Sequence, residues 1–140
     1  MNNVIFHITV KGIVIYNHQI LILKRTRPSS DGLGFWELPG GGLEYGETPH
    51  EALIRELKEE TDLDIKILKP VYTFTAIRPQ YQTVGIGFLC IPTNDCVHIS
   101  DEHTEYKFVH SNELLNYLDE KIYNDIIFTL KEYESMNIEE

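Results

Sequence analysis

The sequence predicts a single α/β domain spanning residues 1–140, with strands on both sides of one helix and a second helix near the end. Four segments are rich in β-branched and aromatic residues, which favour strands: 6–16, 19–25, 65–77 and 83–91. Two segments predict helices instead: good helix formers fill 49–61, and 120–135 spaces its apolar residues for a buried stripe. The length suits one domain with its own core.

The predicted strands follow one another with clear breaks. Residues 6–16 alternate at first and then become apolar on both faces, as in a strand that enters a covered sheet. Asn17-His18 is a turn that pairs this strand with 19–25, and a Pro- and Ser-containing loop follows from 26 to 34. Pro70 predicts a bulge or a sheet edge within 65–77.

The helix over 49–61 has a well-marked start. Thr48 suits the N-cap, Glu51 completes a capping box, and Pro49 falls at the first helical position. Before it lies a glycine-rich loop that allows close approach by a ligand: Gly40, Gly41, Gly42 and Gly46.

Three carboxylates project from one side of this helix. At about 100° per residue, Glu56, Glu59 and Glu60 fall within an arc of roughly 100°. Like charges so close repel one another and raise some of the pKa values. Mg²⁺ prefers oxygen ligands, usually shared with substrate phosphates, and would remove the repulsion. Arg55 can pair with Glu59 or reach back to Glu47.

This stretch resembles the Nudix box, in which a glycine, five residues, a glutamate and seven residues precede Arg-Glu-U-x-Glu-Glu-x-Gly-U, with U a bulky aliphatic residue. The matching residues are Gly41, Glu47, Arg55, Glu56, Leu57, Glu59, Glu60 and Leu63. A chance match at six fixed positions is expected on the order of once in ten million starts. Asp62 stands where the family has glycine, which implies a modest stability cost because that residue is left-handed.

The resemblance implies a fold and a reaction. The Nudix fold is an α/β/α sandwich with a central mixed β-sheet, and its enzymes hydrolyse a pyrophosphate bond in a nucleoside diphosphate linked to another moiety. It implies Mg²⁺, for which Mn²⁺ can substitute, held by Gly40 through its carbonyl and by Glu56, Glu59 and Glu60. The implied catalytic residues are Arg55, Glu56, Glu59 and a carboxylate of the acidic loop, either Glu102 or Glu105. The general base is left open among Glu56, Glu102 and Glu105.

The substrate is less well determined. The expected substrate-binding residues are Arg25, Arg27, Phe35, Gly40, Gly41 and Tyr81. By family rules of thumb, Pro79 favours ADP-ribose and Tyr81 favours dinucleoside polyphosphates, so ADP-ribose-like compounds, sugar nucleotides and dinucleoside polyphosphates all stay open. The alternatives are a MutT-like nucleoside triphosphate pyrophosphatase and a non-catalytic nucleotide-binding module, which the complete set of carboxylates disfavours.

Charge and cysteine content set further expectations. A net charge of −10 disfavours nucleic acid and membranes as partners, which leaves a small nucleotide and either a monomer or a homodimer. Cys90 and Cys96 form no CxxC pair, and no signal segment is evident, so a reduced, cytoplasmic setting is expected. The six histidines show no metal-ligand spacing, although His103 adjoins the acidic loop.

Overall fold

A computed structural model describes residues 3–26 and 35–136. In chain order its elements are β1 (Ile5–Tyr16), β2 (Gln19–Arg25), β3 (Trp36–Glu37), β4 (Gly40–Gly42), α1 (Pro49–Thr61), β5 (Ile65–Ile77), β6 (Tyr81–Pro92), β7 (His103–Val109), the 3₁₀ helix η1 (Ser111–Asn116) and α2 (Glu120–Ser135). The predicted strands and helices are thus present with nearly the expected bounds.

The sheet is mixed, as the resemblance implies. The strand order is β3-β2-β1-β6-β5, with β4 paired to β1 and β7 paired to β2. Among the described strands, only β1 and β6 pair in parallel, from Ile5 opposite Tyr81 to Val14 opposite Cys90. The turn at Asn17 and His18 has φ values of 50° and 62°, which is the geometry of a tight hairpin.

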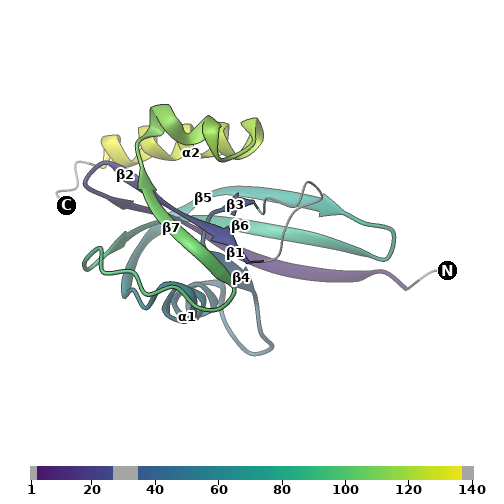
Figure 1. The fold of residues 1–140 in the computed structure, drawn as a ribbon. Helices are drawn as coiled ribbons and strands as arrows, with labels where there is room; N and C mark the ends of the chain where they lie inside the picture. The colour runs from purple at the N-terminus through teal and green to yellow at the C-terminus, as the bar shows by residue number, and fades with distance from the viewer. Residues whose placement is uncertain (1–2, 27–34, 137–140) are drawn as a thin grey trace.

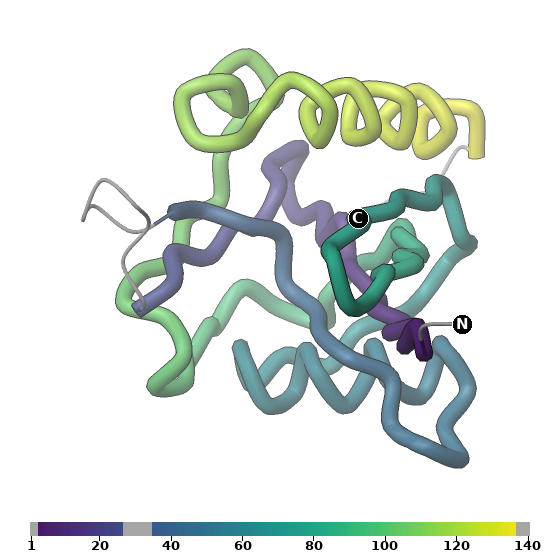
Figure 2. Tube along the Cα trace, turned by 90° about the vertical axis from the view of Figure 1, so that its right-hand side faces the viewer, coloured from purple at the N-terminus to yellow at the C-terminus, as the bar shows by residue number. Residues whose placement is uncertain are grey.

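Helices cover both faces of the sheet (Figures 1 and 2), with α1 on one side and α2 together with η1 on the other. Alternate residues of β1 therefore enter two separate cores: Val10 and Val14 pack with Leu53 of α1, and Ile13 and Ile15 pack with Ile126 of α2. This double burial explains why β1 is apolar at each consecutive position from Ile13 to Ile15. The architecture is an α/β/α sandwich.

One local feature differs from the sequence prediction. Gly40–Gly42 forms a short strand, because it pairs with Thr9, Val10 and Lys11 of β1. The loop that approaches the helix is therefore held against the middle of the sheet. Among the described residues, no helix is both long and apolar enough to cross a membrane.

Candidate active site

The start and end of α1 are determined by local contacts. The Thr48 side chain accepts a hydrogen bond from the Glu51 N–H, and the Glu51 carboxylate accepts one from the Thr48 N–H, each at 3.1 Å. At the other end, Asp62 is left-handed with φ 62° and donates its N–H to the Lys58 carbonyl. Asp62 thus has the conformation that the glycine of the Nudix pattern adopts readily.

The glycine strand brings backbone against the acidic face of α1. The Gly40 N–H donates to Oε1 of Glu60 at 2.7 Å. A side chain at Gly40, which has φ +143°, would collide with the Val10 carbonyl, and one at Gly41 would overlap the Glu56 carboxylate. Both positions require glycine for these two carboxylates to lie directly beneath the strand.

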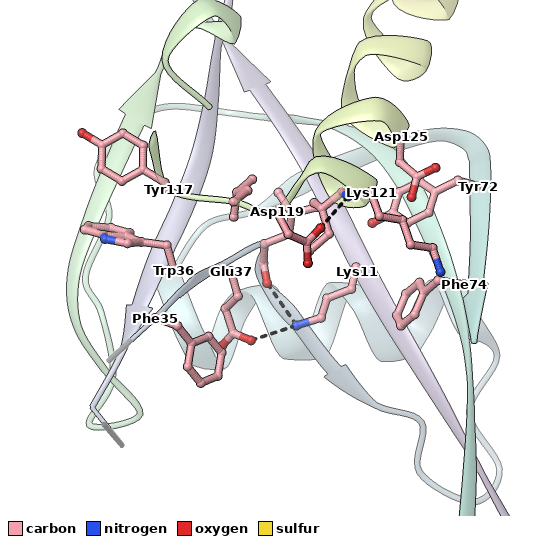
Figure 3. Close-up of a pocket in the computed structure, with 13 residues that line it drawn as sticks. Lys11, Phe35, Trp36, Glu37, Tyr72, Phe74, Tyr117, Asp119, Lys121 and Asp125 are labelled. Atoms are coloured by element: carbon pink, nitrogen blue, oxygen red, sulfur yellow. Dashed lines mark hydrogen bonds and ion pairs between the residues drawn. The ribbon is translucent and has the colours of Figure 1, made fainter. Parts of the chain in front are cut away.

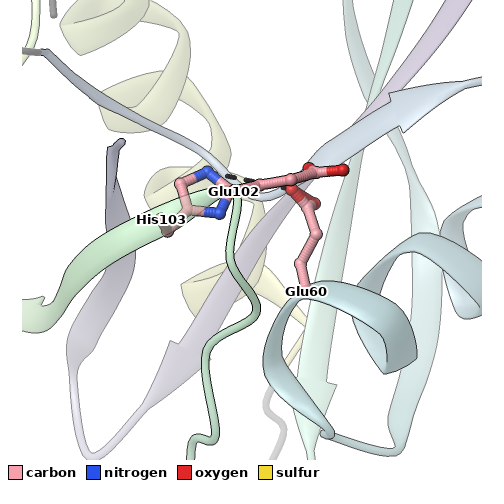
Figure 4. Close-up of side chains that lie close together, drawn as sticks. All are labelled: Glu60, Glu102 and His103. Carbon is pink, nitrogen blue, oxygen red and sulfur yellow. Dashed lines mark ion pairs between the residues drawn. The ribbon is translucent and has the colours of Figure 1, made fainter. Parts of the chain in front are cut away.

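A polar cleft of about 340 Å³ opens at this point. Its walls come from β1, β4, α1 and the loop before β7, and its lining consists of Thr9, Lys11, Arg25, Glu37, Gly40, Gly41, Gly42, Glu56, Glu60 and Glu102. Glu60, Glu102 and His103 each place one potential ligand atom within 4.8 Å of the others (Figure 4). We call this space the carboxylate cleft.

Burial changes the acidity of the two helix carboxylates that line this cleft. Burial is the main cause that raises the pKa of Glu60 to about 7, and the hydrogen bond from Gly40 opposes it. Burial also raises the pKa of Glu56, while the Arg55 guanidinium opposes this rise. Ionised carboxylates in this cleft are therefore short of positive charge, which is the condition under which a cation binds.

Arg55 braces the loop against the helix. Its guanidinium donates to both oxygens of Glu47, at 2.7 and 2.9 Å, and to the Gly42 carbonyl at 3.0 Å. It also donates to Glu56 at 3.0 Å and lies 3.4 Å from Glu59. The hydrogen bonds from Arg55 lower the pKa of Glu47 to about 2. Glu59 is 59% exposed and does not line the carboxylate cleft.

The structure separates the two acidic-loop candidates. Glu102 lines the carboxylate cleft, and within the described part of the chain its carboxylate makes no hydrogen bond or ion pair. Glu105 instead lies 3.4 Å from Lys24 on the neighbouring strand β2. Of the two, only Glu102 is close to the helix carboxylates.

Sequence reasoning missed Lys11 and Glu37 at this site, and it noted His103 only because that residue adjoins the acidic loop. Glu37 lies between Lys11, at 3.3 Å, and the His103 ring, at 2.9 Å. Burial opposes ionisation of Glu37, yet the His103 hydrogen bond and the nearby cations lower its pKa. The His103 side chain is fully buried, and its Nδ1 has no partner among the described residues. No spacing signal could have found Lys11 and Glu37, because they come from two different strands, β1 and β3.

An aromatic cleft of about 500 Å³ adjoins the carboxylate cleft (Figure 3). Its aromatic lining residues are Phe35, Trp36, Tyr72, Phe74 and Tyr117. Trp36 also packs edge-on against Tyr117, with ring centroids 5.4 Å apart. The Arg25 guanidinium lies 5.6 Å from the Phe35 ring centroid and 3.6 Å from Glu37. Arg25, which lines the carboxylate cleft, and Phe35, which lines the aromatic cleft, are therefore at the boundary between the two clefts.

One expected substrate residue, Tyr81, is not brought to this place. Tyr81 pairs with Ile5 at the far end of β1 and stacks on His7 at 4.9 Å. Six strand residues, about 20 Å, separate Ile5 from Lys11 in the cleft. Arg27 lies outside the described residues.

Comparison with known proteins agrees with this geometry. The family model described as NUDIX domain matches residues 6–130. An ADP-ribose pyrophosphatase from Methanocaldococcus jannaschii is 34% identical over 122 residues, covering 84% of this chain and 71% of that protein. An 8-oxo-dGTP diphosphatase from Proteus vulgaris is 46% identical over 59 residues, covering 42% of this chain and 52% of that protein. A solved MutT protein from Methanosarcina mazei Go1 matches with a TM-score of 0.74 at 25% identity, covering 94% of this chain and 96% of that one.

The relatives are pyrophosphatases and diphosphatases by name, and this chain is accordingly a pyrophosphohydrolase. It belongs to the Nudix family, whose model covers most of its length.

Proposed function

We propose that this protein is a divalent-metal-dependent hydrolase that cleaves the pyrophosphate bond of a nucleoside diphosphate linked to another moiety, with ADP-ribose as the leading candidate. The observation that carries this proposal is the carboxylate cleft, in which Glu56, Glu60 and Glu102 converge beside the backbone of Gly40–Gly42. Similarity to the archaeal ADP-ribose pyrophosphatase over 71% of its length supports the substrate class.

The residues present suit Mg²⁺ or Mn²⁺. The donors in the cleft are carboxylate oxygens, which hard divalent cations prefer. Glu56, Glu60 and the Gly40 carbonyl would hold the metal, with Glu102 within reach. Glu59, which does not line the carboxylate cleft, stays a ligand predicted from the sequence. Burial raises the pKa values of Glu56 and Glu60, and a bound cation would offset the cost of ionising them. When bound, the metal would supply charge neutralisation on the substrate phosphate oxygens and a more acidic water.

Glu102 is the residue that we propose as general base. It faces the cleft, and its carboxylate is free of hydrogen bonds and ion pairs within the described residues, so it can accept a proton from the attacking water. Arg55 of α1 binds Glu47 and the Gly42 carbonyl of β4, and these bonds hold β4 against the helix. The aromatic cleft, next to Phe35 and Trp36, offers stacking surface for a nucleobase.

A second candidate function is hydrolysis of nucleoside triphosphates, as in a MutT-like enzyme. It is favoured by the 46% identity to an 8-oxo-dGTP diphosphatase, although this similarity covers only 59 residues.

Both cysteines are free, which supports the reducing, cytoplasmic setting that we propose for either function.

A substrate panel tests the proposal. ADP-ribose, sugar nucleotides, dinucleoside polyphosphates, nucleoside triphosphates and NADH are incubated with protein and Mg²⁺, and the products are resolved by mass. We expect fastest cleavage of ADP-ribose to AMP and ribose 5-phosphate. Faster release of pyrophosphate from a nucleoside triphosphate would favour the second candidate, and no cleavage of any compound would reject both.

A further inference from the structure

The carboxylate cleft and the aromatic cleft meet at two residues. Among the described residues, Lys11 and Glu37 alone line both spaces. If the proposed function holds, a nucleotide with its base in the aromatic cleft and its anhydride in the carboxylate cleft must cross this junction. The phosphate next to the nucleoside then lies against Lys11 and Glu37.

The Lys11 ammonium is held at the junction by two hydrogen bonds, and it has a third N–H donor that can bind a ligand. Lys11 lies on β1 opposite Gly40. Its ammonium donates to Oε1 of Glu37 at 3.3 Å and to the Leu38 carbonyl at 3.1 Å. Figure 3 draws the bond between Lys11 and Glu37 as a dashed line. An ammonium has three N–H donors, so one of them has no hydrogen-bond acceptor among the described residues. The side chain is only 20% exposed, which limits screening of its charge by water.

The neighbouring charged groups are less suited to this contact. Glu37 is an anion and repels phosphate. Arg25 lines the carboxylate cleft but not the aromatic cleft. Lys121 lines the aromatic cleft but not the carboxylate cleft. Lys11 is thus the one cationic side chain, among those described, that lines both clefts.

We propose that Lys11 binds the phosphate group next to the nucleoside, and that Glu37 is a positioning residue that holds the Lys11 ammonium at the junction. Lys11 donates a charge-assisted hydrogen bond to a non-bridging oxygen of that phosphate. Glu37 is itself fixed by the hydrogen bond with buried His103, so the Lys11 ammonium has a defined place before substrate arrives. This assignment rests on the proposed function.

The contribution of the phosphate group can be measured without catalysis. The 5′-monophosphates of the four common ribonucleosides and the matching nucleosides are titrated into the protein by calorimetry, in chelator. For the base that binds best, we expect the monophosphate to bind more tightly than the nucleoside. In Lys11→Met this advantage should fall by about 10- to 100-fold, with nucleoside affinity unchanged.

Lys66→Met is the matched control, because Lys66 is an exposed lysine of β5 that lines neither cleft, and its substitution removes the same charge. It should keep the full advantage, and Lys11→Arg should keep most of it. If Lys11→Met does not fold, Lys11→Gln repeats the test, since its amide can still donate to the Leu38 carbonyl.

An unchanged advantage in a folded Lys11 variant, or no advantage in the unmodified protein, would overturn the assignment of Lys11. Hydrolysis of the substrate panel is scored separately. A protein that hydrolyses the panel but shows no Lys11 effect loses only this inference, whereas a protein that hydrolyses no compound loses the proposed function.

Discussion

Glu102 and Glu105 are both glutamates and lie only three positions apart, yet their side chains have different neighbours. Glu102 lines the carboxylate cleft, and Glu105 pairs with Lys24. We expect Glu102→Gln to lower kcat by about 100-fold or more, because removal of a general base has effects of this size. Glu105→Gln should leave kcat nearly unchanged. Initial rates at saturating substrate and Mg²⁺ measure both, and equal losses would contradict the choice of Glu102.

Glu60 is buried, with only 3% of its surface exposed, and its carboxyl group makes stability depend on pH. Its pKa is about 7 in the folded protein against 4.5 for a free side chain. Between these values the folded state keeps a proton that the unfolded state has lost. In the absence of metal, the free energy of unfolding should therefore fall as pH rises from about 4.5 to 7, on the order of 3 kcal/mol from this group.

Urea unfolding in chelator at both ends of this pH range tests the effect. For each protein, the change in the free energy of unfolding between the two pH values is measured. The change in the unmodified protein is then compared with that in Glu60→Gln, because the other groups titrate in both proteins. The variant should lose less stability across the range. An identical pH dependence in the two proteins would show that Glu60 is not protonated in the folded state.

At the scale of single elements, α1 ends in a left-handed residue that is aspartate, although glycine is the usual residue there. Asp62 adopts the left-handed conformation after the helix and partly offsets its cost through the side chains of Lys58 and His98, each 3.5 Å away. Both contacts are exposed and contribute little. We expect Asp62→Gly to raise the free energy of unfolding by about 0.5 kcal/mol, since glycine enters this region at low steric cost.

Asp64→Gly is the matched control. Asp64 also pairs with Lys58, at 3.2 Å, but does not have a positive φ. Glycine at this position should therefore destabilise the protein, because it only adds freedom to the unfolded chain. Chemical denaturation compares the two variants, and hydrolysis should be retained in Asp62→Gly. A large loss of activity there would reveal a role for Asp62 beyond the helix end.

For the whole molecule, the net charge of −10 and the carboxylate cleft predict that metal binding and stability are interdependent. Chelator should abolish hydrolysis, and Mg²⁺ or Mn²⁺ should restore it. Metal at about 100 times its dissociation constant should also stabilise the fold by about 2.7 kcal/mol, because it binds only the folded state.

Thermal unfolding with and without metal measures this stabilisation independently of activity. Glu60→Gln, which removes one of the proposed ligands, should show a much smaller shift. Hydrolysis that persists in chelator would reject the metal-dependent mechanism. An equal thermal shift in Glu60→Gln would show that Glu60 is not a ligand of the metal.

The sequence by itself determined what depends on contacts a few residues apart. The capping box at Thr48, the left-handed end at Asp62 and the turn at Asn17 all lie where spacing and turn chemistry predict them. The strong Nudix pattern also identified the family, because its residues are contiguous along one loop and one helix.

Only the tertiary structure decided which distant residues share the site. Lys11, Glu37 and His103 come from β1, β3 and β7, and strand pairing alone brings them to Glu60. The same pairing places Tyr81 at the opposite end of β1, despite its suggestive spacing after the helix. Sheet register joins residues far apart in the chain, and a motif read along one segment contains no information about that register.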